Sequence, residues 1–305
     1  MEIVSSSFRQ RMLALHGSKG KVWLEQLPAL LDSLCRRWSL AIEQPLRDLS
    51  YNFVAQARRP DGTPVMLKVG VPNDELLSEI AALRHYDGRG CVMLLEADAE
   101  LGAMLLERLE PGTMLVALDD DRATRIAAEV MQTLWRPLPE AHSFVTTETW
   151  ARGIARLRAA FDGGSGPFPP QLVDAAERLF PDLLASAEEP VLLHGDLHHY
   201  NILAAQRQPW LVIDPKGVSG EPLYETGALL RNPMPQVGAW PDLRRRLARR
   251  VDILAEHLQG DRARIVAWGL AQAVLSSWWN YEDEGKHGEE ALIVAEALWA
   301  MHKGV

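Results

Sequence analysis

A change in hydrophobic pattern near residue 110 constrains the fold more than any other feature of the sequence. Residues 40–110 alternate short apolar runs with turn residues, and the one helix-like stretch among them is "VPNDELLSEIAALRHY" at 71–86. This order predicts strand, strand, strand, helix, strand, strand. After residue 112, apolar residues recur mainly every three or four positions, as in amphipathic helices. The pattern predicts two lobes, at 1–110 and 111–305.

Turn and capping residues support this division. Apolar positions repeat at three and four through residues 6–38, which predicts one or two leading helices. The segment "RRPDGTPV" places Pro, Asp and Gly between two strand-like runs and predicts a hairpin. Asn73 or Asp74 is expected to cap the helix that follows. The "DGGSGPFPP" segment at 162–170 is expected to be a loop inside the second lobe, because helical patterns lie on both sides of it.

Composition and charge narrow the range of functions. Of the 305 residues, 47% are hydrophobic and 24% are charged, as in an ordinary globular protein. The formal net charge of −9 argues against nucleic-acid binding, because phosphate backbones require clustered positive charge. The same charge suits a cationic small-molecule substrate.

No targeting or membrane segment is predicted. The N-terminal "MEIVSSSFRQRM" lacks the basic-then-apolar order of a signal peptide, and no run of about 18 apolar residues occurs. Cys35 and Cys91 have neither zinc-site spacing nor a disulfide pattern, which fits a reducing compartment. We therefore expect a cytoplasmic protein with no membrane partner.

The stretch "VLLHGDLHHYNILAAQRQPWLVID" at 191–214 carries the most chemistry. Phosphoryl transfer needs a carboxylate that faces the nucleophile, together with an amide and a second carboxylate that hold magnesium. Asp196, Asn201 and Asp214 supply these groups in that order. The three histidines raise the alternative of a zinc hydrolase, but their order does not reproduce the His-x-His-x-Asp-His of metallo-β-lactamase-like hydrolases, and no helix-borne HExxH occurs. We interpret His194 as a scaffold residue and the other two as packing or surface residues.

The "HGDLHHYNIL" and "VIDPKG" motifs resemble the catalytic loop and metal-binding strand of aminoglycoside phosphotransferases, relatives of the protein kinases. The resemblance covers nearly the whole chain. It implies an α+β bilobal protein kinase-like fold, with an N-terminal antiparallel sheet plus one helix and a mainly helical C-terminal lobe. It also implies that Asp196 is the catalytic base, that Asn201 and Asp214 are Mg²⁺ ligands, and that ATP or GTP binds in the cleft between the lobes.

The same resemblance implies nucleotide contacts in the N-terminal lobe. Lys68 in "PVMLKVG" would contact the phosphates, and Glu79 in "LLSEIAALR" would pair with it, with Glu75 one turn away as the alternative. The run "LLERLEPG" resembles the hinge, so backbone atoms of Glu107, Arg108 and Leu109 are expected to bind adenine. The turn "DLSYNFV", with Ser50, Tyr51 and Asn52, is expected to cover the phosphates, although it lacks the glycines of protein kinases.

Within this superfamily, "GEPLYETGALLRNP" and "SSWWNYEDEG" are most similar to the streptomycin 6-phosphotransferase and hydroxyurea phosphotransferase group. The resemblance implies transfer of a γ-phosphate to a hydroxyl of an aminoglycoside-like acceptor. Aromatic rings and carboxylates bind cationic groups, so the acceptor contacts are expected among four residues. They are Glu225, Trp279, Glu282 and Asp283. The alternative for the last three is that Trp278 and Trp279 form a core pair followed by a solvated acidic turn.

Three other functions remain open at this point. A kinase of the same fold could act on a metabolic hydroxyl compound such as a sugar, choline or an amino alcohol. A nucleotide-binding pseudokinase is disfavoured, because the base and both metal ligands are present. The zinc hydrolase is the third. The sequence leaves open the acceptor's identity, the position phosphorylated, the choice between ATP and GTP, and the oligomeric state.

Overall fold

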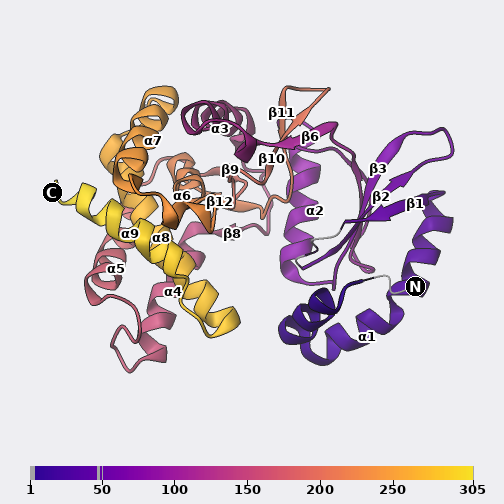
Figure 1. Cartoon of the computed structure of the whole chain (residues 1–305), viewed down its shortest axis with the longest axis horizontal. Helices are drawn as coiled ribbons and strands as arrows, with labels where there is room; N and C mark the ends of the chain where they lie inside the picture. Colours follow the sequence, from indigo (N-terminus) through magenta and orange to yellow (C-terminus); the bar gives the residue numbers. More distant parts are fainter. Residues whose placement is uncertain (1–3, 47–48, 50, 305) are drawn as a thin grey trace. The chain divides into compact units, whose positions relative to one another are not determined.

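The computed structural model describes residues 4–46, 49 and 51–304, and the chain divides after residue 112 into two compact units (Figure 1). The described residues of the first unit form a five-stranded antiparallel sheet of order β1-β2-β3-β5-β4 and two helices. The second unit is mainly helical, with short strands. The structure confirms the α+β, kinase-like fold expected from the sequence.

The elements of the first unit follow the predicted order of three strands, one helix and two strands after a leading helical region. Their bounds are α1 Ser6–Trp38, β1 Ala41–Pro45, β2 Phe53–Arg58, β3 Pro64–Val69, α2 Asp74–Tyr86, β4 Leu94–Asp98 and β5 Ala103–Glu107. The central strand β3 pairs with β2 on one side and β5 on the other. Its Lys68 lies opposite Val54 and Met104.

Helix α1 covers the core of this unit with an apolar stripe. Gly17, at φ 54°, interrupts its helical backbone, which agrees with the expectation of one or two helices. Phe8, Met12 and Leu34 are fully buried and belong to the same cluster as Phe53 of the sheet. Burial of large apolar side chains contributes about 1.5–3 kcal/mol each, so this stripe holds the leading helix on the unit.

Helix α2 begins where the sequence predicts. The Asn73 side chain accepts a hydrogen bond from the Leu76 N–H at 2.8 Å and so caps the helix. Leu76, Ile80 and Leu83 are buried, as expected. Glu79 is one residue before Ile80 and is also buried, which places a carboxylate on the inward face of the helix.

The elements of the second unit are helices with short strands between them. The helices are η1 Leu115–Ala117, α3 Asp120–Leu134, α4 Thr147–Ala160, α5 Pro170–Ala185, η2 Pro222–Glu225, α6 Thr226–Leu230, η3 Gln236–Ala239, α7 Leu243–Leu258, α8 Arg262–Glu284 and α9 Glu289–His302. The strands are β6 Pro111–Met114, where the chain divides, β7 Arg136–Pro137, β8 Val145–Thr146, β9 Val191–Leu193, β10 Ile202–Ala205, β11 Trp210–Val212 and β12 Val218–Gly220. They form two small sheets, of order β11-β10-β6 and β7-β9-β12-β8.

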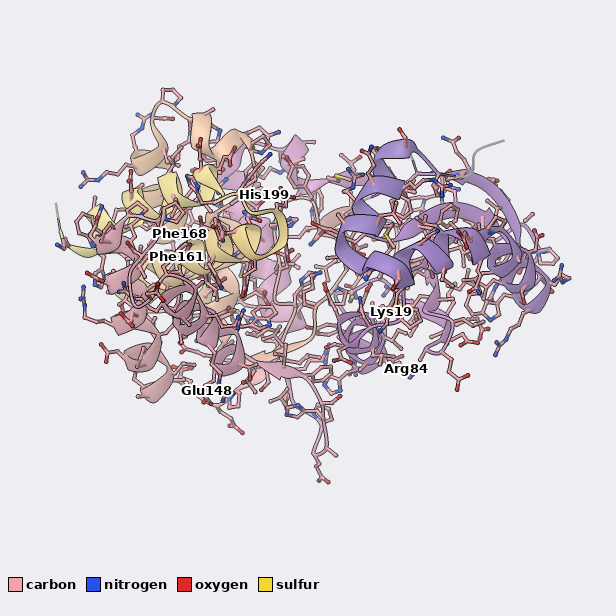
Figure 2. All side chains as sticks on the ribbon, turned by 90° about the horizontal axis from the view of Figure 1, so that it is seen from below. Lys19, Arg84, Glu148, Phe161, Phe168 and His199 are labelled. Atoms are coloured by element: carbon pink, nitrogen blue, oxygen red, sulfur yellow. The ribbon has the colours of Figure 1, made fainter. Side chains whose placement is uncertain are left out.

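Helix α8 is the central helix of the second unit and packs against α5, α6 and α9. The loop at 161–169 folds back onto this helix: Phe161 and Phe168 lie side by side in Figure 2, with ring centroids 6.3 Å apart, and both contact Trp278. The loop therefore connects helices within the second unit, as expected. Among the described residues, no helix is long and apolar enough to cross a membrane.

Candidate active site

The loop at 194–201, between β9 and β10, is fastened to the segment that follows β11. His194 Nε2 lies 2.8 Å from the Ile213 carbonyl, the Lys216 N–H donates to the His194 carbonyl at 2.7 Å, and the Ile213 N–H donates to the Asn201 carbonyl at 3.0 Å. Pairing of β9 with β12 and of β10 with β11 holds both ends of these segments. The structure thus brings the segments that carry Asp196, Asn201 and Asp214 together.

Arg231 and His198 contact the Asp196 carboxylate. Arg231 donates from Nη2 to Oδ1 at 3.0 Å, and His198 Nε2 lies 3.5 Å from Oδ2. Burial acts to raise the pKa of Asp196, but the contact with His198 and its charge, with the charges of Arg231 and Lys216, outweigh it and hold that pKa well below its usual range. Asp196 is therefore ionised at neutral pH.

Asn201 and Asp214 offer oxygen atoms of the kind that Mg²⁺ prefers. The Asn201 Nδ2 donates to the Asp196 carbonyl at 2.9 Å, which leaves Oδ1 as the amide atom suited to a metal. Asp214 adopts φ 59°, in the left-handed region that only a few percent of non-glycine residues occupy and that recurs at functional sites. Mg²⁺ commonly takes one or two protein carboxylates and completes its shell with water and phosphate, so these residues fit it.

The three histidines have structural partners rather than a shared metal geometry. His194 is fully buried on the Ile213 carbonyl, and burial lowers its pKa to about 4, so it is neutral at pH 7. His199 is 3% exposed and lies 3.2 Å from Arg250. In the part of the chain that the structure describes, no group of three or more His, Cys, Asp or Glu residues could hold a metal ion.

Glu225 lies beneath the loop rather than on an acceptor-facing surface. Glu225 is 1% exposed. Its carboxylate oxygens accept hydrogen bonds from the N–H of His194 at 2.7 Å and from the N–H of Gly195 at 2.9 Å. The acceptor contact expected of Glu225 therefore needs correction, since both carboxylate oxygens face the protein interior. Burial raises the pKa of Glu225 to about 7, against the effect of the Gly195 and His194 N–H groups.

In the first unit, the structure places Lys68 and Glu79 in a buried ion pair. Lys68 Nζ lies 2.6 Å from Glu79 Oε1 and 2.8 Å from Oε2, and the two residues are 4% and 7% exposed. Glu75, the alternative partner, lies on the exposed side of α2. A lysine on a central strand that is fixed by a carboxylate is a rigid positive charge, which suits a phosphate-binding role.

The other residues expected to bind nucleotide make contacts that do not themselves indicate this role. The Glu107 N–H donates to the Met93 carbonyl at 2.9 Å, and Arg108 lies 3.1 Å from Glu43. Leu109 follows directly, beyond the end of β5. Asn52 packs against Gly70, Tyr51 is 51% exposed, and Ser50 lies outside the described residues.

The other three residues expected to bind the acceptor, Trp279, Glu282 and Asp283, lie near the end of α8. Trp279 meets the edge of Trp150 at 5.2 Å, and Glu282 accepts two hydrogen bonds from Arg156, at 2.8 and 2.9 Å. Arg156 thus neutralises the carboxylate that was expected to face a cation. Asp283, the next residue of the same helix, is exposed.

Two residues near the site have no motif to mark them in the sequence. Trp150 on α4 packs against the loop, since a Cβ on Gly195 would lie 3.0 Å from its ring. Arg231 follows α6 and contacts Asp196. Helical periodicity marks a buried face but does not say which loop that face meets. The "GEPLYETGALLRNP" run that carries Arg231 indicates the family group and not a contact with Asp196.

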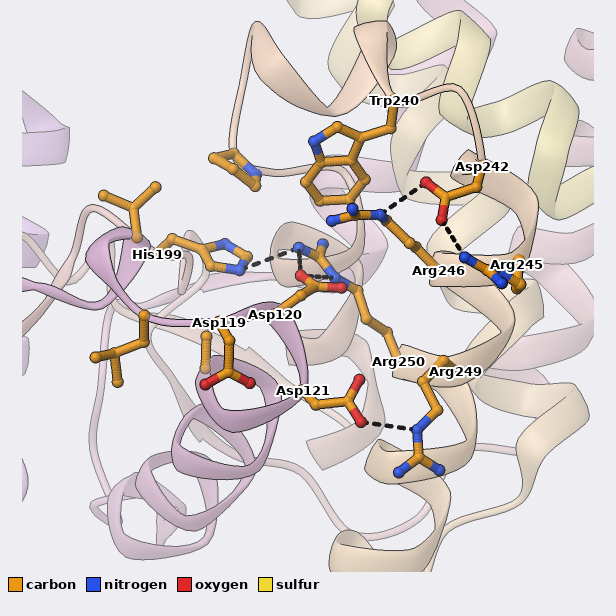
Figure 3. A pocket seen from close by; sticks show the side chains of 14 residues that line it. Asp119, Asp120, Asp121, His199, Trp240, Asp242, Arg245, Arg246, Arg249 and Arg250 are labelled. Carbon is orange, nitrogen blue, oxygen red and sulfur yellow. Dashed lines mark hydrogen bonds and ion pairs between the residues drawn. The ribbon is translucent and has the colours of Figure 1, made fainter.

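A cavity of about 680 Å³ lies within the second unit between α3 and α7 (Figure 3). His199, three residues after Asp196, lies at its wall. The guanidinium groups of Arg246 and Arg250 each lie 4.8 Å from the ring centroid of Trp240. Its arginines are paired with aspartates: Arg245 and Arg246 with Asp242, Arg249 with Asp121, and Arg250 with Asp120. The volume suits a small molecule. The paired charges select neither a cation nor an anion.

Solved structures with the same fold are kinases of small molecules. The chain is similar to aminoglycoside phosphotransferase APH(4)-Ia in its ternary complex with ADP and hygromycin B, with a TM-score of 0.64 and 18% identity over 89% of this chain and 97% of that one. It is also similar to choline kinase LicA from Streptococcus pneumoniae, with a TM-score of 0.62 and 14% identity over 92% of this chain and 100% of that one. At these identities the likeness shows a kinase-like fold.

Sequence comparison gives the family. Residues 37–284 match the model of the aminoglycoside/hydroxyurea antibiotic resistance kinases, and the chain belongs to this family. It is 34% identical to streptomycin 6-kinase of Streptomyces griseus, over 92% of each chain. It is 37% identical to hydroxyurea phosphotransferase of Kitasatospora aureofaciens, over 92% of this chain and 82% of the relative. The protein is therefore a small-molecule phosphotransferase that acts on a hydroxyl group.

Proposed function

We propose that the protein transfers the γ-phosphate of ATP to a hydroxyl of a streptomycin-type acceptor in a magnesium-dependent reaction. The observation that carries this proposal is the hydrogen-bonded assembly of the 194–201 loop with the segment after β11, which gathers Asp196, Asn201 and Asp214. We also propose that it acts in the cytoplasm, where Cys35 and Cys91, which form no disulfide, would stay reduced.

Asp196 is proposed to accept a hydrogen bond, and then the proton, from the acceptor's hydroxyl. In the loose transition state of phosphoryl transfer, the nucleophile loses its proton late, so orientation matters more than basicity. The lowered pKa of Asp196 is consistent with this role, because it keeps the carboxylate ionised and ready to orient the hydroxyl. The ADP leaving group needs no proton from the protein.

Asn201 Oδ1 and the Asp214 carboxylate are proposed to hold Mg²⁺, which would neutralise charge on the triphosphate. Lys68 is proposed to contact the α and β phosphates. Glu79 fixes the direction of its ammonium group, as the distances of 2.6 and 2.8 Å indicate. Backbone atoms of 107–109 and the turn at 50–52 remain the proposed contacts for the base and the phosphates.

The streptomycin-type acceptor is supported by the relatives named streptomycin 6-kinase and by the aromatic and acidic residues at the end of α8. Trp279 and Asp283 are the proposed contacts for a cationic group.

A second candidate acceptor is a neutral hydroxyl compound. The Arg156–Glu282 pair and the balanced charges of the cavity favour it, since both lower the local demand for a cation.

A panel of acceptors tests the proposal. Purified protein is incubated with ATP or GTP, Mg²⁺ and one of streptomycin, hydroxyurea, choline, an amino alcohol or a free sugar, and both ADP or GDP release and the mass of the acceptor are followed. We expect a phosphorylated product from streptomycin. Product from a neutral acceptor alone would favour the second candidate, and nucleotide turnover with no phosphorylated acceptor anywhere in the panel would contradict both.

A further inference from the structure

Arg231 joins the proposed base to the interior of the second unit. Its Nη2 donates to Asp196 Oδ1 at 3.0 Å, and its Nη1 donates to Gln272 Oε1 at 3.2 Å. The Arg231 side chain is 8% exposed, whereas the Asp196 side chain is 30% exposed. The guanidinium therefore holds the carboxylate from the protein side and leaves its other face toward solvent.

Gln272 of α8 is itself fixed in place. Its Nε2 donates to the Tyr224 carbonyl, and its amide packs so closely on Gly227 that a Cβ there would overlap it. Gln272 is 3% exposed. A chain of contacts thus runs from the Tyr224 carbonyl through Gln272 and Arg231 to Asp196, and it links η2, α8 and the end of α6 to the loop.

We propose that Arg231 is a positioning residue for phosphoryl transfer, which holds Oδ1 of Asp196 so that Oδ2 is aimed at the acceptor's hydroxyl. This inference rests on the proposed function. Oδ2 has His198 Nε2 at 3.5 Å, beyond a normal hydrogen bond, so it can take a hydroxyl in place of that contact. A carboxylate displaced by about 1 Å from its productive place can cost about 100-fold in rate.

The chemistry of arginine explains why this position would not tolerate lysine fully. A guanidinium presents several donors in a planar, fixed arrangement, so one group can bind Asp196 and Gln272 at once. A lysine ammonium is a flexible point charge and would satisfy mainly one of them. A lysine variant should therefore restore charge but not orientation.

The test compares Arg231→Met, Arg231→Lys, Gln272→Met and the double Arg231→Met/Gln272→Met variant, using the acceptor on which the wild type acts. We expect Arg231→Met to lower kcat by about 100-fold, with KM for ATP within about two-fold of wild type. Arg231→Lys should recover part of the loss. Gln272→Met should lose less, and the double variant should lose no more than Arg231→Met alone, because both act through one contact chain.

Arg264→Met is the matched control for a purely structural loss. Arg264 lies on α8, as Gln272 does, and like Arg231 it has an acidic partner: Glu221 is largely buried, and the Arg264 side chain is 19% exposed. This variant should be less stable but keep the kcat of its folded fraction.

Three results would overturn the inference: an unchanged kcat in Arg231→Met, a loss confined to KM for ATP, or an equal loss of kcat in Arg264→Met. A wild type that phosphorylates no acceptor would instead remove the proposed function, and the inference with it.

Discussion

Among single residues, Glu225 combines full burial with a carboxyl group whose protonation changes near neutral pH. Its pKa rises from 4.5 to about 7, a difference of about 3 kcal/mol. Because the folded protein holds this proton more tightly than the unfolded chain, the stabilisation is complete below about pH 4.5 and is lost as the pH rises through 7. The N–H groups of His194 and Gly195 limit that loss.

We therefore predict a difference between wild type and Glu225→Gln that depends on pH. The free energy of unfolding of the wild type, minus that of the variant, should fall by about 3 kcal/mol between about pH 5 and pH 8, because glutamine cannot ionise. Urea denaturation at several pH values measures it, and the contributions of other groups cancel in the difference. Parallel pH curves for the two proteins would contradict the raised pKa.

The residues of the candidate site differ in how well a sequence can show them. Asp196, Asn201 and Asp214 could be found because a catalytic loop fixes their spacing along the chain. Arg231 and Trp150 reach the loop only through folding, from α6 and α4, so no local pattern shows them. Glu225 was misplaced for a similar reason: its carboxylate belongs to a short 3₁₀ helix, and the sequence does not say which side of such a turn is buried.

At the scale of elements, the ion pair between Lys68 and Glu79 joins β3 to α2 in the first unit. Breaking a buried pair by removing one partner leaves an uncompensated charge and costs about 3–5 kcal/mol, whereas replacing both partners with apolar residues costs far less. The pair therefore ties helix to sheet in addition to its proposed role with phosphates.

We predict that Glu79→Leu lowers the free energy of unfolding by about 3–5 kcal/mol and that adding Lys68→Met restores most of that loss. Urea denaturation of the single and double variants gives the comparison. Glu43→Gln, in a solvent-exposed pair with Arg58, is the control and should change stability by about 0–1 kcal/mol. Equal destabilisation of the single and double variants would show that the charge of Lys68 is not the cause.

Elements of the two units were not equally predictable. In the first unit, the strands have five or six residues and flank one capped helix. The spacing of apolar residues therefore changes clearly between the period of strands and that of a helix. In the second unit, β7 to β12 have two to four residues each, too few for a period of two to be recognised. These strands pair with one another and so satisfy their own backbone N–H and C=O groups.

At the scale of the whole molecule, residues 37–284 carry the pattern of the aminoglycoside/hydroxyurea antibiotic resistance kinases. Several acidic groups have arginine partners, so the net charge of −9 does not by itself locate a site for a cationic acceptor. Turnover of the acceptor is the property that distinguishes an enzyme of this fold from a protein that only binds nucleotide. The central claim is that Asp196 acts on the acceptor's hydroxyl during phosphoryl transfer.

Turnover of wild type and Asp196→Asn, measured with the acceptor that the panel identifies, tests that claim most directly. Asparagine keeps the shape of the side chain but cannot take the proton, so we predict a fall in kcat of about two to four orders of magnitude, with Mg–ATP affinity by calorimetry unchanged. Asp252→Asn, in an exposed pair with Arg262, should retain wild-type kcat. An Asp196→Asn enzyme that turns over at the wild-type rate would contradict the account.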